Sequence, residues 1–536
     1  MRTMLCLLTV GSIFSLSFLK AGESWVNEPN AILVLGQSDF GTASAGRDAR
    51  LTFAHDVVVD PSTGKVFVCD TGNHRVLRFA AFESLQNGAS AEAVLGQQDL
   101  QTQVFGTGAD EMNLPRGIAI DGDGTLWVAD TKNHRVLRFD SAAAKSNGSP
   151  ADGVLGQPVF NKVVPGVSDK LMFEPSDVAV DSRGNLYVAS RVNNRVIIFS
   201  NAAALPNGSS ATKVLGQETM ESNFASSGAN GMSAPEGVAL DAAGTLYVSD
   251  TGNNRVLRFD EPLNRVIPAG VARNLVLGNH ANAVFGQVDF GIGTPGLPED
   301  GLNKPVQLGV DGQGSLWVAD SQNQRVIRFS NPSTAGNGIK PDRAVGQPEL
   351  STDQIGDSAN RVNTPLSVSF DGQGRMWVAD GNNSRILVFE QTLFRPDFSI
   401  GRSLGSLKGD NVYDPSGNSQ KHTQLSKKKE AKFATLIQND GEATDTYLVA
   451  SAKTNKKIKI TVFLTSGGRV NVTAATKVGA HNTGTIPASG AQIYEIKGKP
   501  RGKFRDKRRN HPVWIQATSL INGSTDRVNG VVKHRP

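Results

Sequence analysis

Cysteine is almost absent from this 536-residue chain, which has only Cys6 and Cys69. Cys6 lies in an N-terminal apolar run that we expect to be removed, so only Cys69 would remain, and a lone thiol excludes an intramolecular disulfide. The scarcity also excludes a cysteine-rich metal site and the disulfide of an antibody-type domain. Burial as a small apolar side chain is the expected role of Cys69.

Familiar catalytic motifs are missing as well. The sequence contains no H-E-x-x-H or phosphate-loop pattern, which removes the common signatures of zinc peptidases and nucleotide-binding proteins. Aromatic residues make up 6% of the chain, whereas glycine occurs 57 times. That balance suits a turn-rich all-β protein, and the length leaves room for a large repeat domain and a second domain.

An apolar run, MLCLLTVGSIFSLSFL, follows Arg2 and ends in the small residues Ala21 and Gly22. This layout is typical of a secretory signal peptide, here residues 1–22, and the run is shorter than a usual membrane span. The sequence therefore predicts a secreted or extracytoplasmic protein with no transmembrane span in the mature chain. An uncleaved anchor is the alternative.

The pattern LWVADTKNHRVLRF at residues 126–139 is one of six copies. The copies begin at Val66, Leu126, Leu186, Leu246, Leu316 and Met376, at intervals of about 60 or 70 residues. Each copy has two β-branched and aromatic runs around a turn-forming cluster, which predicts an antiparallel hairpin. A third run ending in Asp precedes each hairpin, and the sequence VLGQ or a variant of it supplies a fourth. Four strands in six units predict a six-bladed β-propeller over residues 23–391.

The count of strands predicts how the ring closes. The first VLGQ, at Val34, precedes the first hairpin, while no VLGQ follows the last hairpin, which ends at Phe389. We therefore expect the strand at Val34 to pair with residues 385–389 and complete the sixth blade, which protects the strand edges.

The repeated PxGVAxD run, the LYVADTxNxRV hairpin and the VLGQ strand resemble the NHL-repeat family, in the form found in secreted bacterial proteins. The resemblance covers about residues 31–391 and implies a propeller. It does not imply an activity, because one fold carries unrelated functions.

From residue 394 the pattern changes to alternating apolar and polar runs with turn clusters about ten residues apart. This spacing predicts a β-sandwich over residues 394–536. The segments NDGEATDTYLV and VNVTAAT resemble immunoglobulin-like accessory domains of secreted bacterial proteins.

The connections that follow VLGQ are long and lie on the same face of the ring as the hairpin turns. Long loops on a rigid scaffold commonly carry binding sites. We therefore expect an exported, non-catalytic binding or scaffold protein that holds a protein, peptide or glycan on this face. The candidate binding residues are His74, Arg116, His134, Asn194, Asn254 and Gln324.

The alternative is a metal-assisted lyase or lactonase at the mouth of the propeller channel. Peptidylglycine amidating lyases, which the propeller resembles, carry metal-binding histidines at the starts of inner strands. His55 occupies such a position here, but the equivalents are Arg116, Ser176, Glu236, Val306 and Leu366, so a several-histidine zinc cage is absent.

A lactonase-like site would instead use mixed oxygen ligands for calcium. The candidate channel-mouth ligands for calcium or zinc are His55, Asp56, Asp177, Glu236 and Gln307. The simpler expectation, which we favour, is a water-filled mouth with separately solvated polar groups.

The recurring Asp-x-x-Asn-x-Arg pattern, as in Asp130, Asn133 and Arg135, suggests a charged catalytic cluster at first sight. Because it recurs in nearly every unit and catalysis needs one site, we assign it to turn formation and local pairing. Ser190 and Arg191 depart from the pattern, so the third unit should lack the Asp–Arg pair.

Basic residues cluster in the second domain. Lys427, Lys428, Lys429 and Lys432 are close in sequence, and residues 497–509 hold eight cations and one acid, Asp506. An anionic polymer such as a cell-surface polysaccharide would fit this strip, and a solvated loop is the alternative. Nucleic acid is not expected, because export argues against it and interleaved aromatic residues are missing.

Overall fold

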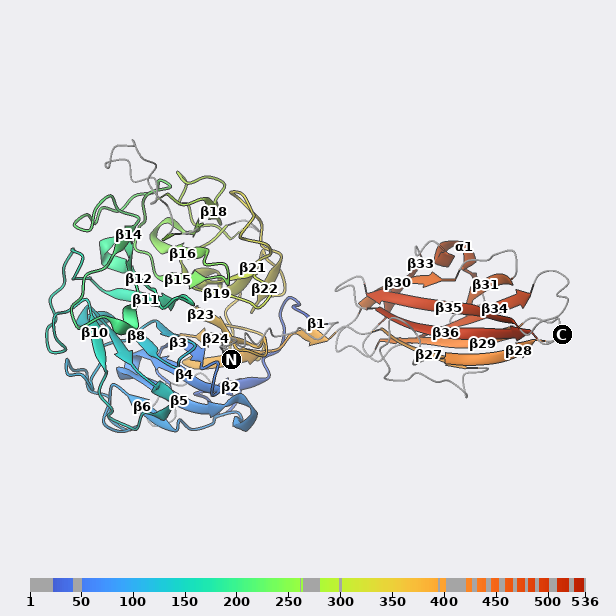
Figure 1. Ribbon diagram of the computed structural model, residues 1–536, viewed down its shortest axis with the longest axis horizontal. Helices are drawn as coiled ribbons and strands as arrows, with labels where there is room; N and C mark the ends of the chain where they lie inside the picture. Colours follow the sequence, from blue (N-terminus) through green and yellow to red (C-terminus); the bar gives the residue numbers. More distant parts are fainter. Residues whose placement is uncertain are drawn as a thin grey trace, which may run out of the picture. The chain divides into compact units, whose positions relative to one another are not determined.

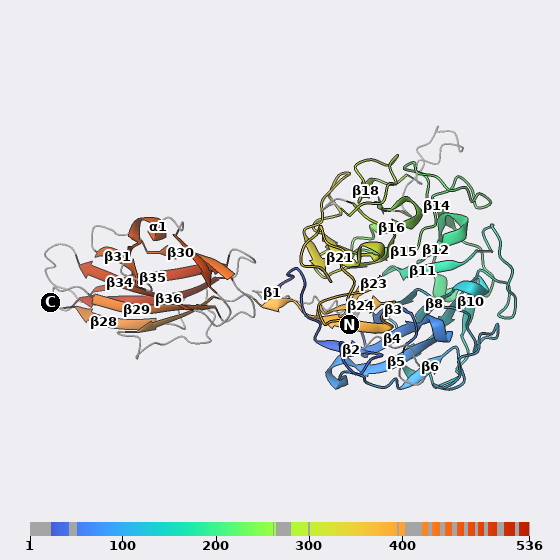
Figure 2. The same cartoon turned by 180° about the vertical axis from the view of Figure 1, so that it is seen from behind.

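The computed structural model describes two separate compact units, residues 26–390 and a C-terminal unit from residue 391 onward (Figures 1 and 2). The first unit is described over residues 26–41, 51–260, 262–263, 280–297 and 301–390. The second is described over residues 23–25, 391–393, 396–401, 421–426, 431–439, 445–452, 458–465, 470–477, 481–486, 491–500, 509–519 and 525–534. The predicted signal peptide lies outside the described residues.

The first unit contains six four-stranded antiparallel sheets. The strands of the first three are β3 (Ala54–Val59), β4 (Lys65–Asp70), β5 (Arg75–Ala81), β6 (Ala93–Leu95); β7 (Ile118–Ile120), β8 (Leu126–Asp130), β9 (Arg135–Phe139), β10 (Gly153–Leu155); β11 (Pro175–Val180), β12 (Leu186–Ser190), β13 (Arg195–Phe199) and β14 (Lys213–Leu215). Those of the last three are β15 (Gly237–Leu240), β16 (Leu246–Asp250), β17 (Arg255–Phe259), β18 (Ala283–Phe285); β19 (Pro305–Val310), β20 (Leu316–Asp320), β21 (Arg325–Phe329), β22 (Arg343–Val345); β23 (Pro365–Phe370), β24 (Met376–Asp380), β25 (Arg385–Phe389) and β2 (Leu33–Leu35).

The sheets form a closed ring. The innermost strands β3, β7, β11, β15, β19 and β23 contact one another in that order, and β23 contacts β3 (Figure 1). The closure expected from the sequence is confirmed, because β2 pairs antiparallel with β25 in the register Leu33↔Val388, Val34↔Leu387 and Leu35↔Ile386. The all-β propeller predicted from the repeat is therefore present.

The apolar core lies between adjacent sheets. One cluster joins Phe67, Cys69 and Val76 of the first sheet to Val128 and Leu137 of the second. Each fully buried large apolar side chain contributes roughly 1.5–3 kcal/mol. Cys69 is free and fully buried, as expected from the sequence, and burial raises the pKa of its thiol.

Buried ion pairs hold the hairpin turns in five of the six sheets. In the second sheet, Asp130 Oδ2 lies 2.7 Å from Arg135 Nε, both side chains are fully buried, and Asn133 Nδ2 donates to the same oxygen over 2.8 Å. Arg135 also donates to carbonyls of the preceding long loop, those of Thr107, Gly108 and Glu111. The structural role predicted for Asp-x-x-Asn-x-Arg is therefore confirmed.

The C-terminal unit contains two five-stranded sheets. The first has the order β27 (Pro396–Gly401), β29 (Ala431–Asn439), β34 (Ala491–Pro500), β31 (Ile458–Leu464), β32 (Val470–Asn471); the second has the order β28 (Lys421–Ser426), β36 (Thr525–His534), β35 (Arg509–Ser519), β30 (Asp445–Ser451), β33 (His481–Ile486). Two-residue strands β1 (Glu23–Ser24) and β26 (Thr392–Leu393) pair with each other.

One apolar cluster joins the two large sheets, with Phe433 and Tyr494 from the first and Tyr447 and Ile515 from the second. This is the packing of a β-sandwich. The immunoglobulin-like character of the unit stays a prediction. The described part of the chain has one α-helix, α1 (Thr473–Lys477), and none of its helices is long and apolar enough to span a membrane.

Candidate functional site

Five long loops of the propeller are held by the glutamine that ends VLGQ or its variant. Gln217 is representative: its Nε2 donates to the Phe224 carbonyl over 2.9 Å, and its Oε1 accepts the Phe224 N–H over 3.1 Å. The same Nε2 donates to the carbonyl of Asn194 in the hairpin turn. Equivalent double contacts link Gln97 to Val104, Gln157 to Val164 and Gln347 to Gln354.

The loops that these glutamines fix carry apolar side chains that are exposed to solvent. The exposed side chains at or beside the clamped position are Val104 (66%), Phe105 (64%), Val164 (51%), Phe224 (78%) and Ile355 (66%). A scattered exposed apolar residue is ordinary, but a recurrence at one position of successive clamped loops on one face is not. The arrangement provides apolar groups at fixed positions for a partner.

The candidate binding residues of the hairpin turns already have structural contacts. Each adopts a left-handed conformation and accepts the N–H of the residue that precedes the proline near the start of the next inner strand: His74 Nδ1 from Leu114, His134 Nδ1 from Glu174, Asn194 Oδ1 from Ala234, Asn254 Oδ1 from Lys304 and Gln324 Oε1 from Thr364. Ser384 does the same for Phe53.

The accepting and donating residues both have positive φ although neither is glycine, which costs on the order of 1 kcal/mol or more at each position. These turns therefore join neighbouring blades. Burial lowers the pKa of His74 and of His134, which favours the neutral ring that can accept this hydrogen bond.

Longer polar side chains alternate around the channel with glycine or serine. At equivalent positions, the six inner strands carry Asp56, Gly117, Asp177, Gly237, Gln307 and Ser367. Gln307 Nε2 lies between the two carboxylates, 3.2 Å from Asp56 Oδ2 and 2.9 Å from Asp177 Oδ1. The glycines leave room for this arrangement: a Cβ on Gly117 would lie 2.3 Å from Asp177 Oδ1 and 2.5 Å from its Cα.

Asp56, Asp177 and Gln307 are called the axial cluster below. All three side chains are buried. Asp56 also accepts the N–H groups of Val57 and Ile118, and Asp177 that of Val238, so each carboxylate ties its own blade to the next.

Burial is the main cause of the unusual acidity of the axial cluster. It raises the pKa of Asp56 to about 7, against a weaker opposing effect of its N–H donors. Burial also raises the pKa of Asp177 well above its ordinary value, and the nearby Asp56 raises it further. A proton on Asp177 removes the repulsion between the two carboxylates.

The expectation of separately solvated polar groups at the channel mouth is wrong, because these side chains are buried and hydrogen-bonded to one another. Three of the five candidate ligands converge. Glu236 does not join them: its Oε1 lies 2.6 Å from Arg191 Nε and 3.8 Å from Arg116 Nη1. His55 is buried near Arg116, and burial lowers its pKa well below the ordinary value.

Arg116, also a candidate binding residue, lies at the mouth with its side chain about a quarter exposed. Among the described residues, Arg116 forms one ion pair, with Glu236, in which Nη1 and Oε1 are 3.8 Å apart. Arg191, which departs from the repeat, binds both Glu236 and Glu174.

Neither proposed metal fits the channel residues as they are arranged. His55 is the sole imidazole at the axis, and the described residues contain no group of three or more His, Cys, Asp or Glu side chains that could hold a metal. For calcium, the place between the two carboxylates is taken by the Gln307 amide nitrogen. The orphaned atoms His55 Nδ1 and Gln307 Oε1 do not make up the set of six to eight oxygens that calcium takes.

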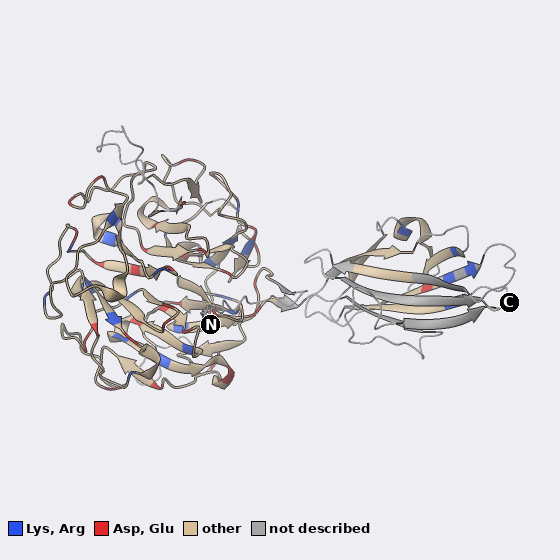
Figure 3. Cartoon of the chain, viewed as in Figure 1, with Lys and Arg blue, Asp and Glu red and all other residues tan. Residues whose placement is uncertain are grey.

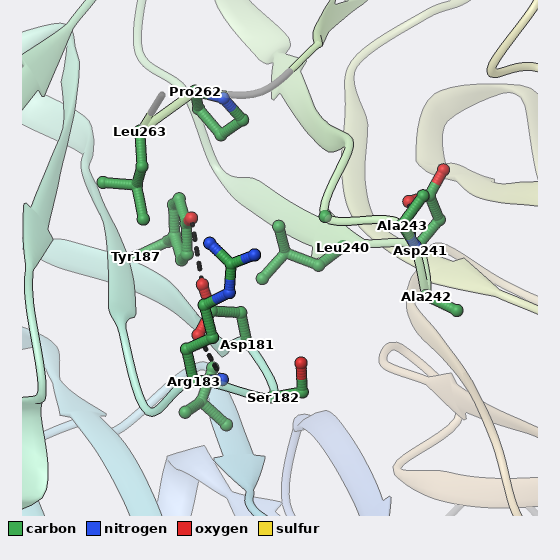
Figure 4. A pocket seen from close by; sticks show the side chains of 12 residues that line it. Asp181, Ser182, Arg183, Tyr187, Leu240, Asp241, Ala242, Ala243, Pro262 and Leu263 are labelled. Carbon is green, nitrogen blue, oxygen red and sulfur yellow. Dashed lines mark hydrogen bonds between the residues drawn. The ribbon is translucent and has the colours of Figure 1, made fainter. Parts of the chain in front are cut away.

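A cavity of about 320 Å³ lies between the third and fourth blades, at the ends of their strands opposite the hairpin turns (Figure 4). Asp181, Arg183 and Tyr187 line it from one blade, and Leu240 and Asp241 from the other. The Tyr187 hydroxyl donates to Asp181 Oδ2 over 3.3 Å, so this pair is internally satisfied. The cavity has no counterpart among the sequence predictions.

Comparisons with known proteins agree with this fold. The NHL repeat model matches residues 51–79, 112–139 and 232–259. Curated relatives include human NHL repeat-containing protein 2, 25% identical over 63% of this chain and 47% of that protein, and zebrafish teneurin-3, 27% identical over 53% of this chain and 11% of that protein. Mouse peptidyl-glycine alpha-amidating monooxygenase is 28% identical over 38% of this chain and 19% of that protein. The chain spans less than half the length of each of these relatives.

Solved structures with a similar fold include virginiamycin B lyase from Staphylococcus aureus, at 14% identity and a TM-score of 0.36, covering 63% of this chain and 80% of that one. A gluconolactonase from Xanthomonas campestris is 14% identical with a TM-score of 0.39, covering 69% of this chain and 97% of that one. We infer no activity from these two likenesses.

Sequence reasoning missed the exposed apolar loop residues and the glutamine contacts. A signal was present: the glutamine follows each VLG-like strand, and an apolar residue stands seven or eight positions later in four of the loops. The exposure of those apolar residues, however, depends on contacts with a hairpin turn about 23 residues away in sequence.

Proposed function

We propose that the protein is an exported, six-bladed binding protein that holds an apolar segment of a partner protein or peptide on its long-loop face. The observation that carries the proposal is the recurrence of exposed apolar side chains at or beside the glutamine-clamped position in four of the long loops. Phe105 and Phe224 are the expected anchors, because rigid aromatic side chains contribute most of the binding energy in protein interfaces.

Two further features support a binding role. The loops are fixed before a partner arrives, so less conformational entropy is lost on association. The side chains of the axial cluster bind one another, so their hydrogen-bonding groups are already engaged within the protein. Export is supported by the N-terminal sequence alone.

The test is selection of peptides from a random library on the full-length protein, followed by affinity measurement with variants. Phe105→Ser with Phe224→Ser should weaken the selected apolar peptides by at least about tenfold, which corresponds to about 1.4 kcal/mol. Val470→Ser is the matched control, since Val470 is an exposed apolar residue (55%) of the C-terminal unit. Equal binding by the loop variant and the wild type would contradict the proposal.

The second candidate is a metal-assisted lyase or lactonase at the channel mouth, whose ligands would have to rearrange from the positions described above; the buried and unpartnered Nδ1 of His55 favours it. Relatives named as amidating enzymes match part of this chain. Elemental analysis of the dialysed protein, with His55→Ala beside it, tests this candidate. About one equivalent of divalent metal that the variant loses would favour it over the binding role.

A further inference from the structure

The outer surface of one C-terminal sheet carries four lysines on three adjacent strands. In β34, Tyr494 and Ile496 point into the apolar core, so by alternation Glu495, Lys497 and Lys499 lie on the outer surface. The same alternation places Lys432 of β29 and Lys459 of β31 on that surface. These four residues, Lys432, Lys459, Lys497 and Lys499, are called the lysine face.

The strand register brings the four cations together. Lys497 is the cross-strand partner of Lys432, and Lys499 is the cross-strand partner of Lys459. Directly opposed side chains have Cβ atoms about 4.5–5.5 Å apart, and like charges at such positions are destabilising. Repulsion is therefore expected between Lys459 and Lys499, which face each other across the strands.

Among the residues that the structure describes, Glu495 is the carboxylate that contacts the lysine face. Glu495 Oε1 lies 3.6 Å from Lys497 Nζ, and Lys497 also lies over the ring of Phe463 at 5.3 Å. Within the part of the chain that the structure describes, Lys459 and Lys499 have no ion-pair partner, and Lys432, Lys459 and Lys499 are exposed. Figure 3 shows the basic residues gathered along β31 and β34.

We infer that the lysine face binds an acidic polysaccharide, a linear polymer with repeated carboxylate or sulfate groups. The argument is charge complementarity: a row of ammonium groups on a flat sheet matches a chain of single negative charges, and a polyanion removes the repulsion between opposed lysines. Phe463 is the aromatic residue on this surface. Its ring lies beneath Lys497 and is therefore not available to stack on nucleic-acid bases. This inference does not depend on the loop-face proposal.

The predicted basic strip of the sequence is only partly covered by this surface. Lys432, Lys497 and Lys499 belong to it, whereas Lys427, Lys428, Lys429 and residues 501–508 lie outside the described residues. Lys459 did not belong to the predicted strip; the strand register places it opposite Lys499 and so in the lysine face.

The experiment measures binding of the full-length protein to heparin and to polygalacturonate, with neutral dextran as a blank. Lys459→Gln with Lys499→Gln should weaken binding to both acidic polymers by about tenfold at low salt, and the difference should shrink at about 0.3 M salt because screening increases. Arg183→Gln with Lys340→Gln removes two exposed propeller cations as the matched control, and its affinity should stay within about twofold of the wild type.

The thermal midpoint of the lysine variant should be unchanged or raised, since a repulsion is removed; this readout also shows that the variant is folded. No binding of either acidic polymer by the wild type, or equal binding by the lysine variant, would overturn the inference. Tighter binding of duplex DNA that the same variant loses would overturn the choice of polysaccharide.

Discussion

Ser190 and Arg195 are cross-strand partners in the third sheet, where every other sheet of the propeller pairs an aspartate with an arginine. Arg195 is fully buried and its Nε has no hydrogen-bond partner among the described residues. Burial lowers the pKa of Arg195 to about 10. Two of its nitrogens still contact carbonyls, those of Met220, Ser168 and Leu171, which is how the long loops of this blade remain attached.

Restoring the aspartate should stabilise the protein. In Ser190→Asp, the new carboxylate would accept from Arg195 Nε and from the Phe173 N–H, which now donates to the Ser190 hydroxyl over 3.3 Å. We expect a gain of about 2 kcal/mol in the free energy of unfolding of the propeller, measured by urea denaturation. The reverse change, Asp250→Ser in the fourth sheet, should cost about 3–5 kcal/mol because it leaves Arg255 unpaired. A loss of stability in Ser190→Asp would contradict this account of Arg195.

Gly117 should not tolerate a side chain. A Cβ there would lie 2.5 Å from the Asp177 Cα and 2.8 Å from the Ser176 carbonyl oxygen, and these backbone atoms cannot move aside as a side chain could. We expect Gly117→Ala to lower the free energy of unfolding by about 3 kcal/mol. Gly122→Ala is the control, since nothing lies within 4 Å of its Cβ, and its effect should be under about 0.5 kcal/mol. Similar midpoints for the two variants in thermal unfolding would show that the axial cluster is not tightly packed.

The axial cluster should make stability depend on pH. The folded pKa of Asp56 is raised to about 7, and that of Asp177 is raised well above its ordinary value, so the folded state holds protons that the unfolded state releases. The stabilisation from these protons is complete below about pH 4, and it is lost as pH rises through 7, by up to about 1.4 kcal/mol per pH unit for each proton.

Asp177→Asn removes one of the two titrating groups while its amide oxygen can still accept the Val238 N–H. The stability of this variant relative to the wild type should therefore rise between about pH 5 and pH 8. Thermal unfolding of both proteins across that range measures the difference. Parallel curves would mean that Asp177 titrates normally.

Gln217 should control the order of the loop that carries Phe224. Gln217→Ala removes the hydrogen bonds to the two backbone groups of Phe224 and to the Asn194 carbonyl. We expect faster hydrogen exchange in residues 218–232 and a loss of about 1–3 kcal/mol in stability. Glu218→Ala, one residue along the same loop, should leave exchange in that segment unchanged.

Much of the propeller could be predicted from the sequence because its information is local and repeated. The hairpins and the turn-forming Asp-x-x-Asn-x-Arg each lie within about 15 residues, and counting strands was enough to place Val34 beside Leu387. In blade three, the sequence pattern has Ser190 where the other blades have aspartate, and the absence of the Asp–Arg pair there could be predicted directly.

The candidate site was harder to predict because it depends on side-chain direction and on contacts between blades. The sequence placed Glu236 with Asp56 at the axis, but Arg191 in the hairpin turn of the preceding blade holds Glu236 in an ion pair. Likewise, His134 looked like a free loop residue, although its Nδ1 accepts the N–H of Glu174, 40 residues away. Such long-range partners are not specified by residue type alone.

The loop-face proposal is tested most directly by hydrogen exchange of the full-length protein with and without a selected apolar peptide. The account predicts slower exchange in the long loops, residues 101–112, 161–171 and 221–231, with the turns at 121–124 and 181–184 on the other face unchanged. Slower exchange confined to those other turns, or to the C-terminal unit, would contradict it.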